Sequence, residues 1–241
     1  MKVGFFGGSF DPPHRGHIAL AKLAIERLGL DRVLIAPVGS QPLKRGQATP
    51  SPFEDRVAML RLALAHQPQM EVSLIDAPRP DGRPNYTIDA LRRLLTELRP
   101  DDQLYCIMGA DSFLTIGKWH RSRELLLLCN FVVASRPGFD LQKIAAALPE
   151  SISLATGDDG SPGSLVIGLR GGERQSRLYL LTDLEQDVSA TGIRQDLRAG
   201  PYASSDPDAS SDPDAASDPD RAIDPAVASY IAEHRLYRHS G

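Results

Sequence analysis

The stretch KVGFFGGSFDPPHRGHIALAKLAIERLG, residues 2–29, carries the strongest structural signal in this chain. After its first lysine it begins with an apolar run that is typical of a buried strand. From residue 18 its apolar side chains recur at helical spacing until Gly29, a plausible helix end. Between the two lies GGSFDPPHRGH (residues 7–17), a turn with two histidines three residues apart, which we call the histidine turn. A strand that leads directly into a helix indicates an α/β fold.

The same alternation continues along the chain. Four further apolar runs predict strands: RVLIAPVG (32–39), EVSLIDA (71–77), QLYCIMGA (103–110) and NFVVASR (130–136). Helices are predicted between them, one of them starting at a capping box of Ser51 and Glu54 with Pro52 at its first position. This order predicts a doubly wound parallel sheet of the Rossmann-like type in a single domain, with helices on both faces. Residues 156–176 are rich in Gly and Ser and predict an excursion such as a loose hairpin.

Near its end the chain carries three consecutive hexapeptides, SDPDAS, SDPDAA and SDPDRA, over residues 205–222. They contain no large apolar side chain, so they cannot form a core and are predicted to be a solvated linker. Calcium binding by the spaced aspartates is a weaker alternative, because no Gly turn or closing Glu completes an EF-type loop. We therefore predict a main domain over 1–203, an acidic linker over 204–222, and a C-terminal helix within 223–241 that packs back on the main domain.

Composition excludes several classes of protein. The net charge is −4, but six of the 31 acidic residues lie within 203–220, which leaves 25 acidic against 27 basic residues elsewhere. No basic surface for nucleic acid is expected from such a balance. No apolar run reaches the ~20 residues that a membrane helix needs, and the first residues lack a signal-peptide pattern. The two cysteines, Cys106 and Cys129, stand apart in apolar runs, which favours buried free thiols and a cytoplasmic location.

The histidine turn has the features of a phosphate site. Gly7 and Gly8 allow close approach of the backbone to a ligand, and Ser9 adds a hydroxyl group. The following helix presents free N–H groups and the positive end of its dipole, and His14 and His17 can donate hydrogen bonds beside it. A pair of histidines at this spacing is, when alone, more often incidental or metal-binding, and the GxGxxG dinucleotide fingerprint is absent.

Five ordered motifs carry a family resemblance. They are the histidine turn, PLKR (42–45), NYTIDAL (85–91), MGADSF (108–113) followed by Trp119, and VSATGIR (188–194). The first resembles the signature of the HxGH nucleotidyltransferases, and the set is most similar to the bacterial nicotinate-nucleotide adenylyltransferases. The terminal AVASYIAEHRLY (226–237) also resembles the closing helix of that family. The resemblance covers nearly all of the chain. It implies that ATP and nicotinate mononucleotide react to give nicotinate adenine dinucleotide and pyrophosphate, a step in NAD biosynthesis.

On the ATP side, the resemblance implies that His14 and His17 are catalytic and stabilise charge on the phosphates. Asp111 would bind the ribose hydroxyls and Arg194 the β- and γ-phosphates. The full set of ATP- and phosphate-binding residues that it implies is Gly8, Ser9, Phe10, Gly109, Asp111, Ser189, Thr191 and Arg194. Mg²⁺ would arrive with ATP, and no protein metal site is expected. Taken alone, Asp111, Ser189 and Thr191 could equally be helix caps.

On the mononucleotide side, the resemblance implies binding by Lys44, Tyr86, Thr87 and Trp119. Trp119 would stack on the pyridine ring, and a helix start at Tyr86 and Thr87 would favour a carboxylate over a neutral amide. Alone, Lys44 could be a surface lysine and Trp119 a core aromatic. His120 stands where the resembling proteins often carry Tyr. A regulatory module that binds nucleotides without turnover is the alternative function, and the intact histidine pair argues against it. The sequence leaves the oligomeric state open.

Overall fold

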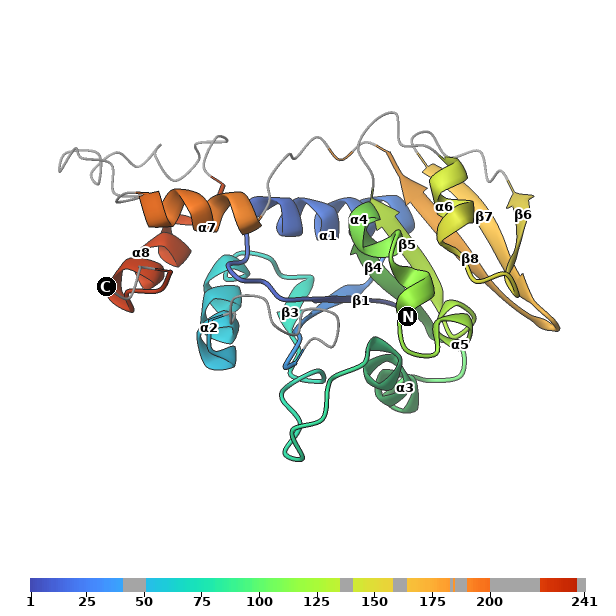
Figure 1. The fold of residues 1–241 in the computed structure, drawn as a ribbon, viewed down its shortest axis with the longest axis horizontal. Helices are drawn as coiled ribbons and strands as arrows, with labels where there is room; N and C mark the ends of the chain where they lie inside the picture. The colour runs from blue at the N-terminus through green and yellow to red at the C-terminus, as the bar shows by residue number, and fades with distance from the viewer. Residues whose placement is uncertain are drawn as a thin grey trace.

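The computed structural model describes residues 1–40, 51–134, 141–157, 164–182, 184, 190–199 and 222–237. Within these residues, eight strands form one sheet in the order β3-β2-β1-β4-β5-β8-β7-β6 (Figure 1). The predicted α/β, doubly wound fold is confirmed, and the sheet is parallel over its first five strands in the chain. In this part of the chain, no helix has the length and apolar character needed to cross a membrane.

The first strand lies at the centre of the sheet. β1 (Lys2–Gly8) pairs in parallel with β2 (Arg32–Pro37) on one side and with β4 (Gln103–Gly109) on the other. β3 (Met70–Val72) lies beyond β2, and β5 (Asn130–Ala134) lies beyond β4. The strand order therefore reverses between β1 and β4. In open α/β sheets, ligands bind at the carboxyl ends of the strands at such a point, and the histidine turn begins there.

Two antiparallel strands extend the parallel sheet at one edge. β8 (Arg174–Leu181) is parallel to β5, but β7 (Ser164–Gly171) and β6 (Ser153–Gly157) are antiparallel to their neighbours. The predicted excursion is thus a regular hairpin, whose short turn places Gly172 at φ 69°. Such tight hairpin turns need a left-handed residue, which glycine supplies without strain.

Helices cover both faces of the sheet, and alternation along β1 separates the two cores. Phe6 faces α1 (Arg15–Leu28) and the end of α2 (Phe53–Ala63), whereas Phe5 faces the opposite side. That opposite side is covered by α3 (Thr87–Glu97), α4 (Ala110–Phe113), the 3₁₀ turn η2 (Ile116–Lys118), α5 (Ser122–Leu126) and α6 (Leu141–Ala147). Figure 1 shows α1 and α3 on opposite sides of the sheet. Cys106 and Cys129 are buried free thiols, as predicted.

A third apolar cluster joins the end of the chain to the domain. α7 (Ala190–Ala199) and α8 (Pro225–Glu233) contribute to it together with α2, through Met59, Ile193, Ile223, Val227 and Ile231. α8 begins at Asp224, whose carboxylate accepts a hydrogen bond of 2.8 Å from the Ala226 N–H, a normal N-cap. Figure 1 shows α8 beside α2. We call residues 222–237 the C-terminal segment.

The start of α2 and the acidic repeat differ in how the structure treats their predictions. α2 starts one residue later than predicted: Pro52 is its N-cap residue and makes no side-chain cap, so the capping box is wrong. The acidic repeat lies outside the described residues except for Ala222, and the three-part domain division stays a prediction. Ala222 itself contacts the domain, because its carbonyl accepts a hydrogen bond of 2.9 Å from the Arg15 N–H.

Candidate active site

The histidine turn brings its two imidazoles together at the first turn of α1. The rings of His14 and His17 stack with their centroids 3.6 Å apart. The backbone N–H of His14 donates to Nδ1 of His17 at 3.1 Å. Because Nδ1 of His17 accepts this bond, the neutral ring carries its proton on Nε2 and can donate it to a ligand. The fold thus fixes both the orientation and the tautomer of His17.

Two phenylalanine side chains pack beside the pair of His14 and His17. Phe10 is buried, and its ring lies 4.9 Å from that of His17, while Phe6 lies 5.3 Å from Phe10. Phe10 adopts φ 48°, in the left-handed region that bulky residues rarely occupy. Such strain persists only where the surrounding structure imposes it, and it clusters at functional sites.

Burial keeps both imidazoles neutral at neutral pH. It lowers the pKa of His14 from 6.5 to about 4. The pKa of His17 is also lowered well below 6.5, first by burial among closely packed atoms and then by the neighbouring His14. Nδ1 of His14 is buried and has no hydrogen-bond partner. Unsatisfied buried groups are rare in folded proteins, which makes this nitrogen unusual.

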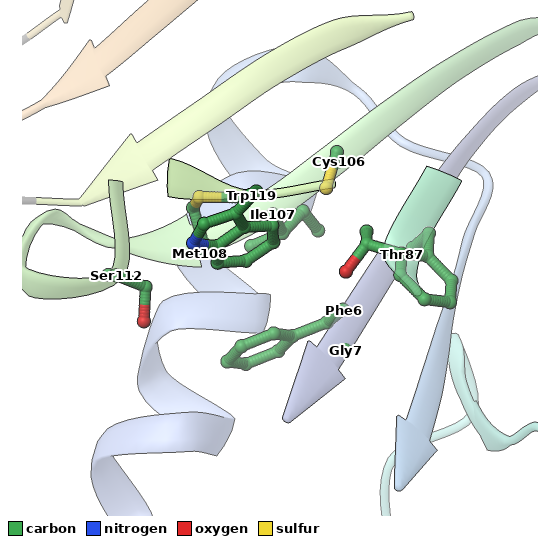
Figure 2. Close-up of a pocket in the computed structure, with 10 residues that line it drawn as sticks. Phe6, Gly7, Thr87, Cys106, Ile107, Met108, Ser112 and Trp119 are labelled. Atoms are coloured by element: carbon green, nitrogen blue, oxygen red, sulfur yellow. The ribbon is translucent and has the colours of Figure 1, made fainter. Parts of the chain in front are cut away.

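A small cavity of ≈ 50 Å³ lies at the carboxyl ends of β1 and β4. Figure 2 shows Phe6, Thr87 and Trp119 approaching it from different elements. Phe6 connects this cavity to the histidine turn, because its ring also lies 5.9 Å from that of His17. The other lining residues are Phe5, Gly7, Cys106, Ile107, Met108, Gly109 and Ser112. The structure therefore brings Gly109, Thr87 and Trp119, three of the predicted site residues, to one cavity next to the histidine pair.

The end of β4 leaves room for a ligand. A Cβ added to Gly109 would meet no atom within 4 Å, and Asp111 lies exposed in the first turn of α4. Gly8 is the last residue of β1, and Ser9 follows it in the histidine turn. An added Cβ at Gly8 would meet the Phe10 ring at 3.1 Å.

The aromatic residues predicted for the mononucleotide lie near the start of α3. Trp119 is half-buried and its indole N–H donates to Oγ1 of Thr115 at 3.0 Å. Tyr86 is the N-cap residue of α3, and its ring stacks on His120 with centroids 4.2 Å apart. The first N–H groups of α3 have no partner within the helix.

Of the VSATGIR motif, the structure places Thr191 and Arg194 beside the histidine turn. Nη1 of Arg194 donates to the carbonyl of Asp11 at 2.6 Å, and its Nη2 donates to Oγ1 of Thr191 at 3.2 Å. Lys44 and Ser189 lie outside the described residues, so their predicted roles stay predictions.

Comparisons with known proteins agree with this arrangement. The model of the cytidylyltransferase-like family matches residues 5–196. A probable nicotinate-nucleotide adenylyltransferase from Geobacter sulfurreducens is 34% identical over 241 residues and covers 100% of both chains. One from Gloeobacter violaceus is 38% identical over 200 residues, covering 83% of this chain and 85% of its own.

The chain belongs to the nicotinate-nucleotide adenylyltransferase family. A solved structure of the Plasmodium falciparum nicotinic acid mononucleotide adenylyltransferase, complexed with NaAD, matches with a TM-score of 0.62. It is 18% identical and covers 98% of this chain and 97% of its own. At that identity the likeness supports the fold that this adenylyltransferase family member adopts.

Sequence reasoning missed a buried polar cluster around Asn85, just before α3. Asn85 Nδ2 donates to the carboxylate and carbonyl of Asp76 and, at 2.9 Å, to the carbonyl of Ala77. Its Oδ1 accepts from the Ser40 N–H at 3.1 Å. Burial raises the pKa of Asp76 to about 6, although the bond from Asn85 acts against this. This cluster ties the chain after β2 to the start of α3, and the only signal in the sequence is one Asn before Tyr86.

Proposed function

We propose that this chain transfers the adenylyl group of ATP to nicotinate mononucleotide, giving nicotinate adenine dinucleotide and pyrophosphate. The observation that carries the proposal is the stacked, neutral pair of His14 and His17 at a helix start, beside a cavity walled by Trp119 and Thr87. The names of relatives that match most or all of the chain give the same reaction. This activity would place the protein in NAD biosynthesis, and we expect it in the cytoplasm.

In the proposed reaction, a phosphate oxygen of the mononucleotide attacks the α-phosphorus of ATP. The new P–O bond forms as the bond to the bridging oxygen of the β-phosphate breaks, and pyrophosphate leaves with that electron pair. The nucleophile needs no activation by a covalent enzyme intermediate. Catalysis is therefore in-line positioning together with stabilisation of charge on the phosphates. Neutral imidazole N–H groups of His14 and His17 would supply that stabilisation.

ATP would lie across the end of the sheet. The space beside Gly109 would admit the nucleoside, with the Asp111 carboxylate on the ribose hydroxyls. The phosphates would lie over the histidine turn at Gly8, Ser9 and Phe10, and extend towards α7. There, Ser189, Thr191 and Arg194 would bind the β- and γ-phosphates.

Mg²⁺ would enter as the ATP complex and neutralise phosphate charge. Among the described residues, no group of three or more His, Cys, Asp or Glu is arranged to hold a metal ion. The phosphate oxygens of ATP are the proposed ligands of the ion, because Mg²⁺ prefers oxygen ligands and is usually bound through substrate phosphates.

The pyridine ring of nicotinate mononucleotide would enter the cavity, with the ring on Trp119 and its carboxylate at the start of α3 near Tyr86 and Thr87. The positive end of the helix dipole favours an anion there. His120 stacks on Tyr86, so an aromatic ring lies beside the start of α3 in this chain. Lys44 would bind the phosphate of the mononucleotide.

Pyrophosphate release tests the proposal. The purified protein is given ATP and Mg²⁺ with either nicotinate or nicotinamide mononucleotide. We expect the acid to exceed the amide by more than about tenfold in kcat/KM, which corresponds to ~1.4 kcal/mol. Trp119→Ala should raise the KM for the mononucleotide and leave that for ATP nearly unchanged. ATP binding without pyrophosphate release would instead identify a regulatory module, and equal rates would identify a dual-specificity enzyme.

A further inference from the structure

Three polar side chains, none of them a predicted site residue, meet at the histidine turn. They are Asp11, Arg56 and Tyr237, which we call the Asp11 cluster. Asp11 is 4% exposed and Arg56 is 2% exposed, and Tyr237 is half-buried. Charged groups are almost never this buried unless they are paired and hydrogen-bonded. Three different parts of the chain supply the cluster: the histidine turn, α2 and the C-terminal segment.

Asp11 receives hydrogen bonds from several directions. The hydroxyl of Tyr237 donates to its Oδ1 at 2.6 Å, across 226 residues of sequence. The backbone N–H of Ser51 donates to the same carboxylate at 3.2 and 3.3 Å. The carbonyl of Asp11 accepts from Arg194. Burial and the Asp11 carboxylate both raise the pKa of Tyr237, so its hydroxyl stays protonated and remains a donor.

Arg56 holds the backbone on the other side of the turn. Its Nη1 donates to the carbonyls of Ser9 and Val38, both at 2.9 Å, and its Nε donates to the carbonyl of Ser51 at 3.1 Å. Burial lowers the pKa of Arg56, while Asp11 opposes that shift. A guanidinium has a fixed planar set of donors, so it imposes one geometry on these carbonyls.

The C-terminal segment also contacts the far end of the histidine turn. The N–H of Arg15 donates to the carbonyl of Ala222 at 2.9 Å. Contacts at Asp11 and at Arg15 therefore flank His14 on both sides. Between Ser9 and Asp11, Phe10 is held at its left-handed φ of 48°, a conformation that needs outside support.

We propose that the Asp11 cluster makes the C-terminal segment part of the active site, with Tyr237 and Arg56 as positioning residues for the histidine turn. The inference rests on the proposed function for its kinetic readout. Arg56 holds the backbone of Ser9 and Tyr237 holds the carboxylate of Asp11, and through them the histidine turn places His14 and His17 against the phosphates. A displacement of about 1 Å in such a site costs roughly 10²-fold in rate.

A second tyrosine of the same segment provides a matched control. The hydroxyl of Tyr230 donates to Oδ1 of Asp55 at 2.8 Å, so it joins the C-terminal segment to α2. Unlike Tyr237, it makes no hydrogen bond to the histidine turn. Removal of either hydroxyl weakens the docking of the segment, but only the loss at Tyr237 acts on Asp11.

The experiment compares Tyr237→Phe with Tyr230→Phe in the full chain. We expect Tyr237→Phe to lower kcat by at least tenfold, about 1.4 kcal/mol in activation free energy, with much smaller changes in both KM values. Tyr230→Phe should keep the wild-type kcat, with a change in Tm similar to that of Tyr237→Phe. Equal kcat values for the two variants would overturn the proposal.

Two further measurements keep the test independent of folding and of the assigned reaction. Arg56→Lys keeps the charge but loses the planar donors, and should lower kcat with little change in KM even if Tyr237→Phe does not fold. Hydrogen exchange reads the turn without any substrate: Tyr237→Phe should speed exchange of the amides in residues 9–17, and Tyr230→Phe should not. Unchanged exchange in Tyr237→Phe would overturn the positioning role. A wild-type protein without pyrophosphate release would overturn only the proposed function.

Discussion

The buried histidine pair should make the protein lose stability at mildly acidic pH. The pKa of His14 is about 4 in the folded protein, against ~6.5 for an unfolded chain. Between these values the unfolded state binds more protons, so the free energy of unfolding falls as pH falls. Relative to pH 7 and above, the linkage relation gives a loss of about 2.5 kcal/mol from His14 alone at pH 4.5. The lowered pKa of His17 acts in the same direction.

Urea unfolding of the wild type and of His14→Asn, at pH 7 and at pH 4.5, measures this contribution. The wild type should lose more stability between the two pH values than the variant does, by about 2.5 kcal/mol. Carboxylates also titrate in this range, but they are present in both proteins and their effect cancels in the difference. The same loss in both proteins would show that His14 is not held neutral by burial. That result would remove the basis for treating it as a neutral donor.

Two other substitutions test the site from different sides. Gly109→Ala should change the free energy of unfolding by less than about 0.5 kcal/mol, since its Cβ meets nothing within 4 Å. It should nevertheless lower kcat/KM for ATP by roughly tenfold. An unchanged kcat/KM would show that no ligand packs there. Asp76→Asn should stabilise the protein above pH 6, by up to about 3 kcal/mol, because burial raises the pKa of this carboxyl to about 6. The gain should disappear below about pH 4, where the unfolded chain is protonated too. Urea unfolding at pH 8 and pH 3.5 measures it, and the same stability difference between variant and wild type at both pH values would contradict the reasoning.

Features with a local signal were predictable from the sequence. The strand and helix around the histidine turn follow from apolar spacing within about 30 residues, and the alternation of elements indicates an α/β sheet. The strand order, which places the turn at a reversal, came from the structure. The family resemblance assigned Gly109 to the ATP side and Thr87 and Trp119 to the mononucleotide side, and all three line one cavity.

Features that depend on tertiary contacts were not predictable. Arg56 lies in α2, where the apolar side chains define the buried face, so in the sequence it looks like a surface arginine. Only its hydrogen bonds to the carbonyls of Ser9 and Val38 show its role. The antiparallel addition of β7 was ambiguous because SLVIGL is a short apolar run with Gly-rich flanks. The link between Asp11 and Tyr237 spans 226 residues and has no local signature.

The hydrogen bond between Asp11 and Tyr237 can form only late in the synthesis of the chain. A ribosome adds roughly 5–20 residues per second, so the 226 residues between Asp11 and Tyr237 take on the order of 10–45 s to translate. For that time the nascent chain already contains β1, the histidine turn and eventually every strand of the sheet, yet lacks the partner that donates to Asp11. A premature stop shortly before Tyr237 would leave all five family motifs in the product. Such a product would resemble the enzyme by motif search while its catalytic turn is still incomplete.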